Sequence, residues 1–425
     1  MTDRVSASAS TYPPRASGDS GILRCSSLFD PRQGKLLADV SVEIEGGRVV
    51  GVTADTAATD CTKSSGWQIS VGSDCTVIPG LIECHNHLQL CPSRVADPRE
   101  DWLRSSDRAL LERMLCNSAK ALHAGITTIR DCGAGRHLDT LFLRRIREAG
   151  LIAPRVLFAG LPIMAREGHL AWMGREVSGP ADAAAAVREQ HEGGADFIKV
   201  TASGGMISGA AGIRSLFLSK EELRSLADQA HELGMRITAH AHSTEAIEAV
   251  AIAGFDMIEH CCWLGRDGLR YKKDVARLIA DSGIVVVPTN AAFYPHGRTK
   301  LQWQALLGSQ VERIGIVAEM LATGIGMVTG ADDQEFNTVA HEAALLVEAG
   351  LDPVDALRAA TLWAAKALGV EQDCGSVEPG KVADIVVVRG NPLVAVEALR
   401  EVVAVVAQGH VVRQIEETAN RTEKW

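Results

Sequence analysis

Two histidines separated by one residue follow an apolar run and could bind a metal ion. The run extends from Val77 to Cys84, and the histidines are His85 and His87. Alternate residues of a strand point to the same side, so both imidazoles are expected on one face. Imidazole nitrogen is the commonest protein ligand of zinc-like metals, and two histidines on one strand would supply half of a site.

Further ionisable residues recur where other apolar runs end. They are Lys199, the pair His240 and His242, His260, and Asp332. A helical stretch follows each of these runs. Ionisable residues repeated at the carboxyl ends of strands predict a (β/α)₈ barrel, that is a TIM barrel, whose top face carries the chemistry.

Eight strand-like runs alternate with helical stretches, as this barrel requires. The expected strands span residues 81–86, 126–131, 155–160, 196–202, 235–241, 256–261, 284–289 and 325–331. Before one expected helix, Ser219 and Glu222 have the spacing of a capping box, and Gly234 is expected to end that helix. A further helix is predicted over residues 353–368, opened by Pro353.

Runs of β type at both ends of the chain predict a second, smaller domain. Val40, Val42 and Ile44 alternate as in a half-buried strand, and the following Gly-Gly pair suits a hairpin turn. We expect an α/β protein in which residues 79–371 form the barrel. Residues 21–78 and 372–415 together would form a β-sandwich domain. Residues 1–20, rich in Ser, Pro and Thr, are predicted to be a flexible tail.

The amino-acid composition favours a globular protein and argues against several classes of partner. A hydrophobic content of 46% over 425 residues allows a large core. A net charge of −10 and only 4% aromatic residues argue against nucleic acid or an anionic membrane as partner. The ten cysteines form no Cys-x-x-Cys pair, which is typical of reduced thiols and core filler in a cytoplasmic protein. No run is long enough to span a bilayer. We also expect a homo-oligomer, whose size the sequence does not define.

Two glycine-rich loops follow expected strands at the same face. One contains Arg166 and His169, and the other spans residues 202–212 and leads to Arg214. The second loop lacks the Walker lysine and the Rossmann spacing, so phosphate binding is not expected. A lid over the site and a plain surface loop both stay open. The two arginines could pair with a substrate carboxylate or could be solvated surface charges.

Several motifs together resemble the amidohydrolase superfamily over residues 25–412. They are Pro79-Gly-Leu-Ile-Glu-Cys-His-Asn-His, Gly125-Ile-Thr-Thr-Ile-Arg-Asp, Phe197-Ile-Lys-Val, Thr238-Ala-His, Ile258-Glu-His and Gly330-Ala-Asp. The segments Gly168-His-Leu-Ala-Trp-Met-Gly and Thr201-Ala-Ser-Gly-Gly look most like the metal-dependent prolidase and Xaa-Arg dipeptidase branch, which includes ochratoxinase-like carboxypeptidases. The resemblance implies a hydrolase that cleaves an amide or peptide bond in a small substrate with a free carboxylate, such as a dipeptide or N-acyl amino acid.

The resemblance also implies a set of ligands and a mechanism. Two divalent ions, with zinc as the expected metal, would share a carbamylated Lys199. The other metal ligands would be His85, His87, His240, His260 and Asp332. Two such ions lower the pKa of a shared water, and Asp332 would carry the proton to the leaving nitrogen. The substrate would contact His169, with a possible catalytic role, and also His242, Arg166 and Arg214.

Two other interpretations stay open. The segment from His242 to Glu245 has the His-x-x-Glu spacing of mononuclear deaminases in this superfamily, which act on aminated heterocycles, so His242 could replace His240 as a ligand. A lysine in an apolar strand is costly unless it has a partner, and Lys199 therefore favours the binuclear hydrolase. A non-catalytic barrel scaffold is the third interpretation, but a scaffold has no need for six ligating residues.

Overall fold

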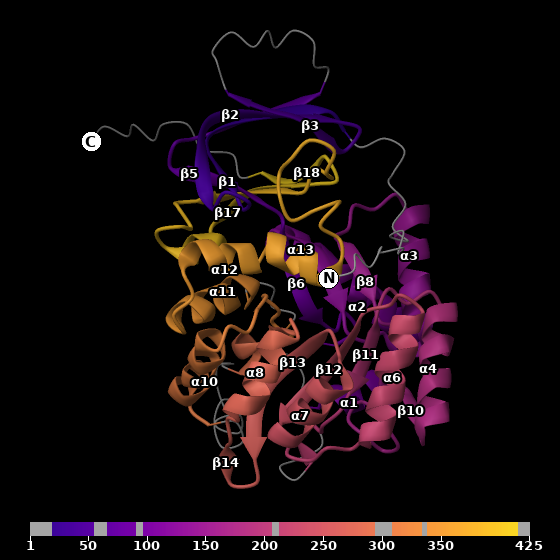
Figure 1. Ribbon diagram of the computed structural model, residues 1–425. Coiled ribbons are helices and arrows are strands. Elements are labelled where there is room, and N and C mark those ends of the chain that lie inside the picture. The colour runs from indigo at the N-terminus through magenta and orange to yellow at the C-terminus, as the bar shows by residue number, and fades with distance from the viewer. Residues whose placement is uncertain are drawn as a thin grey trace, which may run out of the picture.

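The computed structural model describes residues 19–54, 66–90, 97–205, 212–293, 308–333 and 338–414. The tail expected over residues 1–20 lies almost wholly outside these ranges. Figure 1 shows a β-sheet built from both chain ends at one end of the molecule. Parallel strands surrounded by helices make up the larger part.

Within the described residues, one eight-stranded sheet joins the two ends of the chain. Its strand order is β18-β17-β16-β5-β1-β2-β3, with β4 beside β1. Gly46 and Gly47, at φ 56° and 80°, form the turn between two of its strands in the left-handed conformation that tight hairpins require. The strands are β1 (Gly21–Asp30), β2 (Lys35–Glu45), β3 (Arg48–Ala54), β4 (Trp67–Val71), β5 (Cys75–Pro79), β16 (Ile385–Arg389), β17 (Val402–Ala407) and β18 (His410–Gln414).

The parallel strands confirm the predicted α/β class. One sheet contains β6 (Leu81–Asn86), β7 (Ile126–Asp131) and β8 (Arg155–Phe158). The other contains β9 (Ile163–Ala165), β10 (Arg175–Val177), β11 (Ile198–Thr201), β12 (Ile237–Ser243), β13 (Met257–Gly265) and β15 (Val285–Val287), with the short β14 (Gly268–Leu269) antiparallel to β13. The first two predicted strands have the observed bounds, because each is a short, wholly buried run.

Backbone hydrogen bonds pass between the edges of these two sheets. They run from Asp196 N to Phe158 O (2.8 Å), from Cys84 N to Thr329 O (3.1 Å) and from Asp332 N to His85 O (2.8 Å). The segment 325–331, expected as the eighth strand, forms only a parallel bridge between Met327 and Val286. Its glycines at 326 and 330 weaken a regular strand, since glycine loses more conformational freedom than other residues.

Helices cover the parallel strands. They are α1 (Pro98–Arg104), α2 (Asp107–His123), α3 (Leu138–Glu148), α4 (Pro180–Glu192), α6 (Lys220–Glu232), α7 (Thr244–Ala253), α8 (Lys273–Asp281), α10 (Gln310–Ala322), α11 (Thr338–Glu348), α12 (Pro353–Ala359) and α13 (Leu362–Leu368). The capping box of Ser219 and Glu222 is present at the start of α6. The single helix expected over 353–368 is instead divided at Thr361, whose φ of −136° is not helical. Among the described helices, none combines the length and apolarity needed to cross a membrane.

Candidate metal centre

Ionisable side chains gather at the carboxyl ends of the parallel strands. His85 lies on β6, Lys199 on β11, His240 and His242 on β12, and His260 on β13. These five residues are between 1% and 5% exposed, whereas the side chain of Asp332 is 30% exposed. Ligand atoms of His240, His242 and His260 lie within 4.8 Å of one another, and so do those of His85, His260 and Asp332. Because His260 belongs to both sets, the two sets form one cluster, which could hold metal.

The histidines of this cluster are neutral. Burial lowers the pKa of His85 to about 4 and the pKa values of His240, His242 and His260 well below their ordinary value. Neutral imidazole is the form that binds a metal ion through its unprotonated nitrogen.

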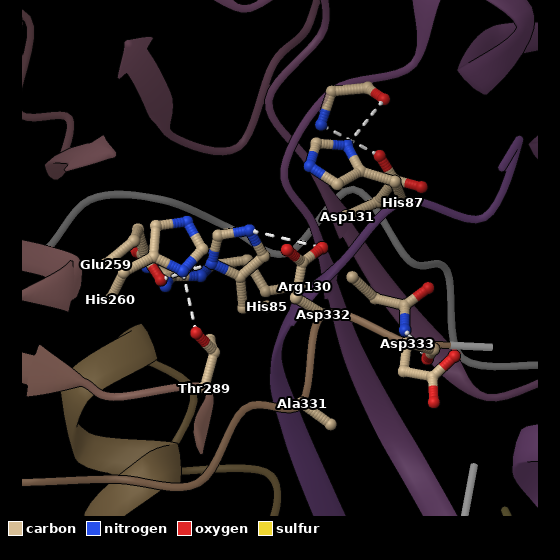
Figure 2. Close-up of polar contacts among 12 residues, drawn as sticks. His85, His87, Arg130, Asp131, Glu259, His260, Thr289, Ala331, Asp332 and Asp333 are labelled. Atoms are coloured by element: carbon tan, nitrogen blue, oxygen red, sulfur yellow. Dashed lines mark hydrogen bonds and ion pairs between the residues drawn. The ribbon is translucent and has the colours of Figure 1, made fainter. Parts of the chain in front are cut away.

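His85 is held by a buried carboxylate. Its Nδ1 donates to Glu259 Oε2 at 2.6 Å, and its Nε2 lies 3.7 Å from Asp332 Oδ1, as Figure 2 shows. An ionised carboxylate only accepts hydrogen bonds, so Nδ1 carries the ring proton and Nε2 offers a lone pair. A carboxylate behind a histidine is the usual partner that orients a metal-binding imidazole.

Glu259 is itself part of a buried ion pair. Arg130 Nη2 donates to Glu259 Oε1 at 2.5 Å, and the hydroxyl of Thr238 donates to the same oxygen. Burial alone would raise the pKa of Glu259, but the charge of Arg130 and the contact with His85 hold it well below its ordinary range. Arg130 also donates from Nε to Cys84 O at 2.6 Å, so the pair fixes His85 rigidly.

Sequence reasoning missed this ion pair. The signal was present, because Arg130 interrupts the apolar run of β7 just as Lys199 interrupts that of β11. The same argument about the cost of a buried charge predicts an anionic partner for Arg130. That partner is Glu259, the residue before His260 on β13.

The histidines on the other side of the cluster, His240 and His260, have uncharged hydrogen-bond partners. His240 Nε2 donates to Gly204 O at 3.0 Å, which leaves Nδ1 unprotonated because a carbonyl only accepts. His260 Nδ1 lies 2.7 Å from Thr289 Oγ1 and leaves Nε2 for the cluster. His260, Thr289 and Asp332 all adopt positive φ, at 66°, 50° and 52°. Strained backbone of this kind gathers at functional sites.

His242 lies beside these ligand candidates and has a different kind of partner. Its Nδ1 is 2.9 Å from Cys262 Sγ, and its ring stacks on that of His260 at 4.5 Å with an interplanar angle of 17°. Glu245 is exposed in the first turn of α7. The His-x-x-Glu spacing therefore does not bring Glu245 into the cluster.

Lys199 has a buried Nζ without a hydrogen-bond partner among the described residues. The side chain is 1% exposed, and its charge contributes to the lowered pKa values of His85, His87, His169 and His240. An unpaired buried ammonium is unfavourable. Carbamylation, which turns the amine into an anionic metal ligand, would remove that cost. The unpartnered nitrogen beside neutral histidines therefore fits a bridged metal site.

His87 and His169 flank the cluster. His87 lies 5.6 Å from His85 between ring centroids, and its Nδ1 is 3.4 Å from Gly133 O. The ring of His169 stacks on that of His240 at 4.7 Å, and burial lowers its pKa to about 3. Gly205 packs against this ring so closely that an added Cβ would lie 2.5 Å from it, so this glycine makes room for His169.

The two arginines predicted to bind a substrate carboxylate follow β9 and the second glycine-rich loop. Arg166 is exposed, and Arg214 donates from Nε to Gly265 O at 3.1 Å. Their roles stay predictions. The middle of the second glycine-rich loop, residues 206–211, lies outside the described residues.

Asp332 can exchange a proton near neutral pH. Burial raises its pKa to about 7, although nearby Lys199 opposes that shift. The turn that presents it is held by Glu83, whose Oε1 accepts from His85 N at 2.8 Å and from Ala331 N at 2.9 Å. Asn86 Nδ2 donates to Asp333 O at 2.7 Å on the other side of that turn. Asp332 thus has a fixed position beside His85 Nε2.

Comparison with known proteins identifies the family and the fold of this chain. The chain is 25% identical over 362 residues to an ochratoxinase of Aspergillus niger, covering 77% of this chain and 73% of that protein. The crystal structure of an Xaa-Pro dipeptidase superposes with a TM-score of 0.79 at 23% identity, covering 92% of this chain and 99% of the other. An Aspergillus niger ochratoxinase structure has a TM-score of 0.76 at 21% identity, covering 94% and 96%. The profile of the amidohydrolase family matches residues 76–412. This chain belongs to the amidohydrolase family.

Proposed function

We propose that the protein is a binuclear metal-dependent hydrolase of an amide or peptide C–N bond. The substrate is a small molecule with a carboxylate, either a dipeptide or an N-acyl amino acid. The observation that carries the proposal is the buried Lys199 Nζ, which has no hydrogen-bond partner and faces neutral histidines. The names of the similar proteins, an ochratoxinase and an Xaa-Pro dipeptidase, support an amide substrate.

The proposed fold is a closed (β/α)₈ barrel with a β-sandwich. Two hydrogen bonds support closure. The bond from Asp196 to Phe158 connects β8 to the residues just before β11, and the bond from Cys84 to Thr329 connects β6 to the segment 325–331, which bridges to β15. Leu23, Val77 and Val406, from both chain ends, share one apolar core, which supports a folded-over sheet as the second domain. We keep the bounds 79–371 for the barrel and 21–78 with 372–415 for the second domain. The predictions of a cytoplasmic homo-oligomer rest on sequence alone.

The residues present fit two divalent ions. His85, His87 and Asp332 would hold one ion, His240 and His260 the second, and the carbamate of Lys199 both. When bound, such ions lower the pKa of a shared water and polarise the scissile carbonyl. These ligand types accept zinc, manganese or cobalt, and zinc is the metal that we propose.

Asp332 moves the proton in this proposal. Its carboxylate lies beside His85 Nε2, where it would accept a proton from the attacking water and return it to the leaving nitrogen. Glu83 and Asn86 fix the turn that carries it, so the carboxylate stays beside His85. His169 and His242 lie against His240 and are placed to contact the substrate.

Metal counting combined with product analysis tests the proposal. The metal-depleted protein is reconstituted with zinc, manganese or cobalt in the presence of bicarbonate, and is then offered a panel of dipeptides and N-acyl amino acids. We expect full activity at two ions per chain, with release of a free amino acid. Ammonia release from aminated heterocycles at one ion per chain would favour the deaminase instead. A chain that binds no metal and cleaves no substrate would be a scaffold.

A further inference from the structure

The contact between His242 and Cys262 has no role in the proposed reaction so far. Cys262 lies on β13, is 0% exposed, and places Sγ 2.9 Å from His242 Nδ1. The backbone of His242 is fixed as well, because its N–H donates to Ser203 Oγ at 2.9 Å. Both the position of the ring and the identity of its Nδ1 neighbour are therefore defined.

The hydrogen-bond partner of His242 differs in kind from the partners of His85 and His240. Glu259 and the Gly204 carbonyl can only accept, so His85 and His240 must donate to them and offer their other nitrogen as a lone pair. A thiol can donate as well as accept. Cys262 thus permits the opposite proton arrangement at His242.

Arg313 selects between the two arrangements. The charge of this buried arginine on α10 acts on the Cys262 thiol, and its Nη2 donates to Asn290 Oδ1 at 2.8 Å. A guanidinium has donors and no acceptor, so the thiol proton of Cys262 does not point to Arg313. We infer that the thiol proton points instead to His242 Nδ1, which lies 2.9 Å from Sγ.

We propose that Cys262 is a positioning residue that keeps His242 in the tautomer protonated at Nε2, so that His242 donates a hydrogen bond to the substrate instead of binding a metal. The proposal rests on the proposed hydrolase function and deepens it. Within an amide hydrolase, a fixed neutral N–H beside the metal ligands suits the scissile carbonyl oxygen, where negative charge develops. His240 is then the metal ligand of β12.

Exchange of the thiol tests the proposal in the zinc-loaded enzyme. Cys262→Ala removes the donor and should lower kcat by about ten- to a hundredfold, below the loss of a whole oxyanion donor. KM and the count of two ions per chain should stay unchanged. Cys262→Ser keeps a donor and should recover most of kcat. Cys261→Ala is the matched control, because that neighbouring thiol packs in the apolar core and should leave kcat within about twofold.

Nitrogen NMR of ¹⁵N-histidine-labelled enzyme gives a readout that loss of packing would not move. The wild type and Cys262→Ser should show the His242 proton on Nε2, and Cys262→Ala a mixture of tautomers. A His242 proton on Nδ1 in the wild type, metal loss in Cys262→Ala, or unchanged kcat in that variant would overturn the proposal. An enzyme with two ions and amide hydrolysis but any of these results would keep its proposed function. The wild-type spectrum decides the matter even if a variant does not fold.

Discussion

The two sides of the histidine cluster are held by different chemistry. On one side, His85 donates to Glu259, which is ion-paired with the buried Arg130. On the other, His240 and His260 contact a backbone carbonyl and a threonine hydroxyl, which are both uncharged. Figure 2 shows both kinds of contact beside Asp332.

The difference predicts how each side responds to change. Removal of one partner from a buried ion pair costs about 3–5 kcal/mol, because the other charge is left uncompensated. Loss of a neutral hydrogen bond costs about 0.5–1.5 kcal/mol. Substitution of a partner of His85 should therefore destabilise the site more than substitution of a partner of His240 or His260. Lys199 belongs to neither side, since its Nζ has no hydrogen-bond partner among the described residues.

The largest loss of turnover is expected for substitution of Lys199, which we propose to bridge the two metal ions. Lys199→Met should lower kcat roughly a thousandfold, since metal-bound charge stabilisation is worth several kcal/mol. The same change should stabilise the metal-depleted fold by about 1–3 kcal/mol, because it removes an unpaired buried amine. Steady-state kinetics and thermal unfolding measure the two effects. Near-normal turnover would exclude the bridging role, and a destabilised apo-protein would contradict the absence of a partner.

The second-largest effect is expected when the ion pair of Arg130 and Glu259 is removed. Glu259→Gln should destabilise the fold by about 3–5 kcal/mol, because Arg130 loses its counter-charge. Metal affinity should fall about 10–100-fold, as is usual when the partner of a metal-binding histidine is changed. Competition with a chelator measures the affinity. Glu148→Gln, at a surface site whose nearest cation is 4.0 Å away, is the control and should change neither quantity. If Glu259→Gln changed stability and metal affinity no more than Glu148→Gln does, the ion pair would not stabilise the side of His85.

The neutral side should be more tolerant. Thr289→Ala removes the hydroxyl beside His260 Nδ1 and should weaken metal binding by about two- to tenfold, matching one neutral hydrogen bond, and by less than Glu259→Gln does in the same assay. Thr289→Ser keeps the hydroxyl and should behave like the wild type. The same chelator assay applies. A loss in Thr289→Ala as large as that in Glu259→Gln would mean that charge does not distinguish the two sides.

An effect on stability alone is expected at Glu342, a buried carboxyl in contact with Ala291, two residues after Thr289. Its Oε2 accepts from Ala291 N at 2.7 Å, and burial raises its pKa to about 7 from 4.5. Stability from the protonated group is full below the unfolded pKa and is lost as the pH rises through 7. Glu342→Gln should therefore match the wild type at pH 4.5. It should gain up to about 3 kcal/mol over the wild type by pH 8. Thermal unfolding of the metal-depleted proteins across this range measures the difference. A gap independent of pH would show that Glu342 does not titrate near 7.

Local pattern was enough to predict much of the fold. The strands at 81–86 and 126–131 are short buried runs, and the capping box at Ser219 uses contacts three residues apart. The segment 325–331 was harder, because its pairing with β6 comes from residues more than 240 positions away. The break at Thr361 left no Pro or Gly signal in the sequence.

The candidate site could be predicted only in part. Residue type and position at strand ends pointed to Lys199, His240 and His260, which the structure brings together. The contacts that orient them depend on distant partners, such as Glu259 for Arg130, 129 residues apart. The alternation of side chains does not distinguish His240 from His242, since both share one face of β12, and the resemblance alone favours His240. Our proposal that His240 is the ligand rests in addition on their hydrogen-bond partners, which are known only from the fold.

The most direct test of the account is a crystal structure of the metal-loaded enzyme with anomalous scattering recorded at the metal edge. We expect two metal peaks per chain, one beside His85 and one beside His240 and His260, with a carbamate on Lys199 between them. A single peak with an unmodified Lys199 would contradict the binuclear centre, and with it the proposed hydrolase.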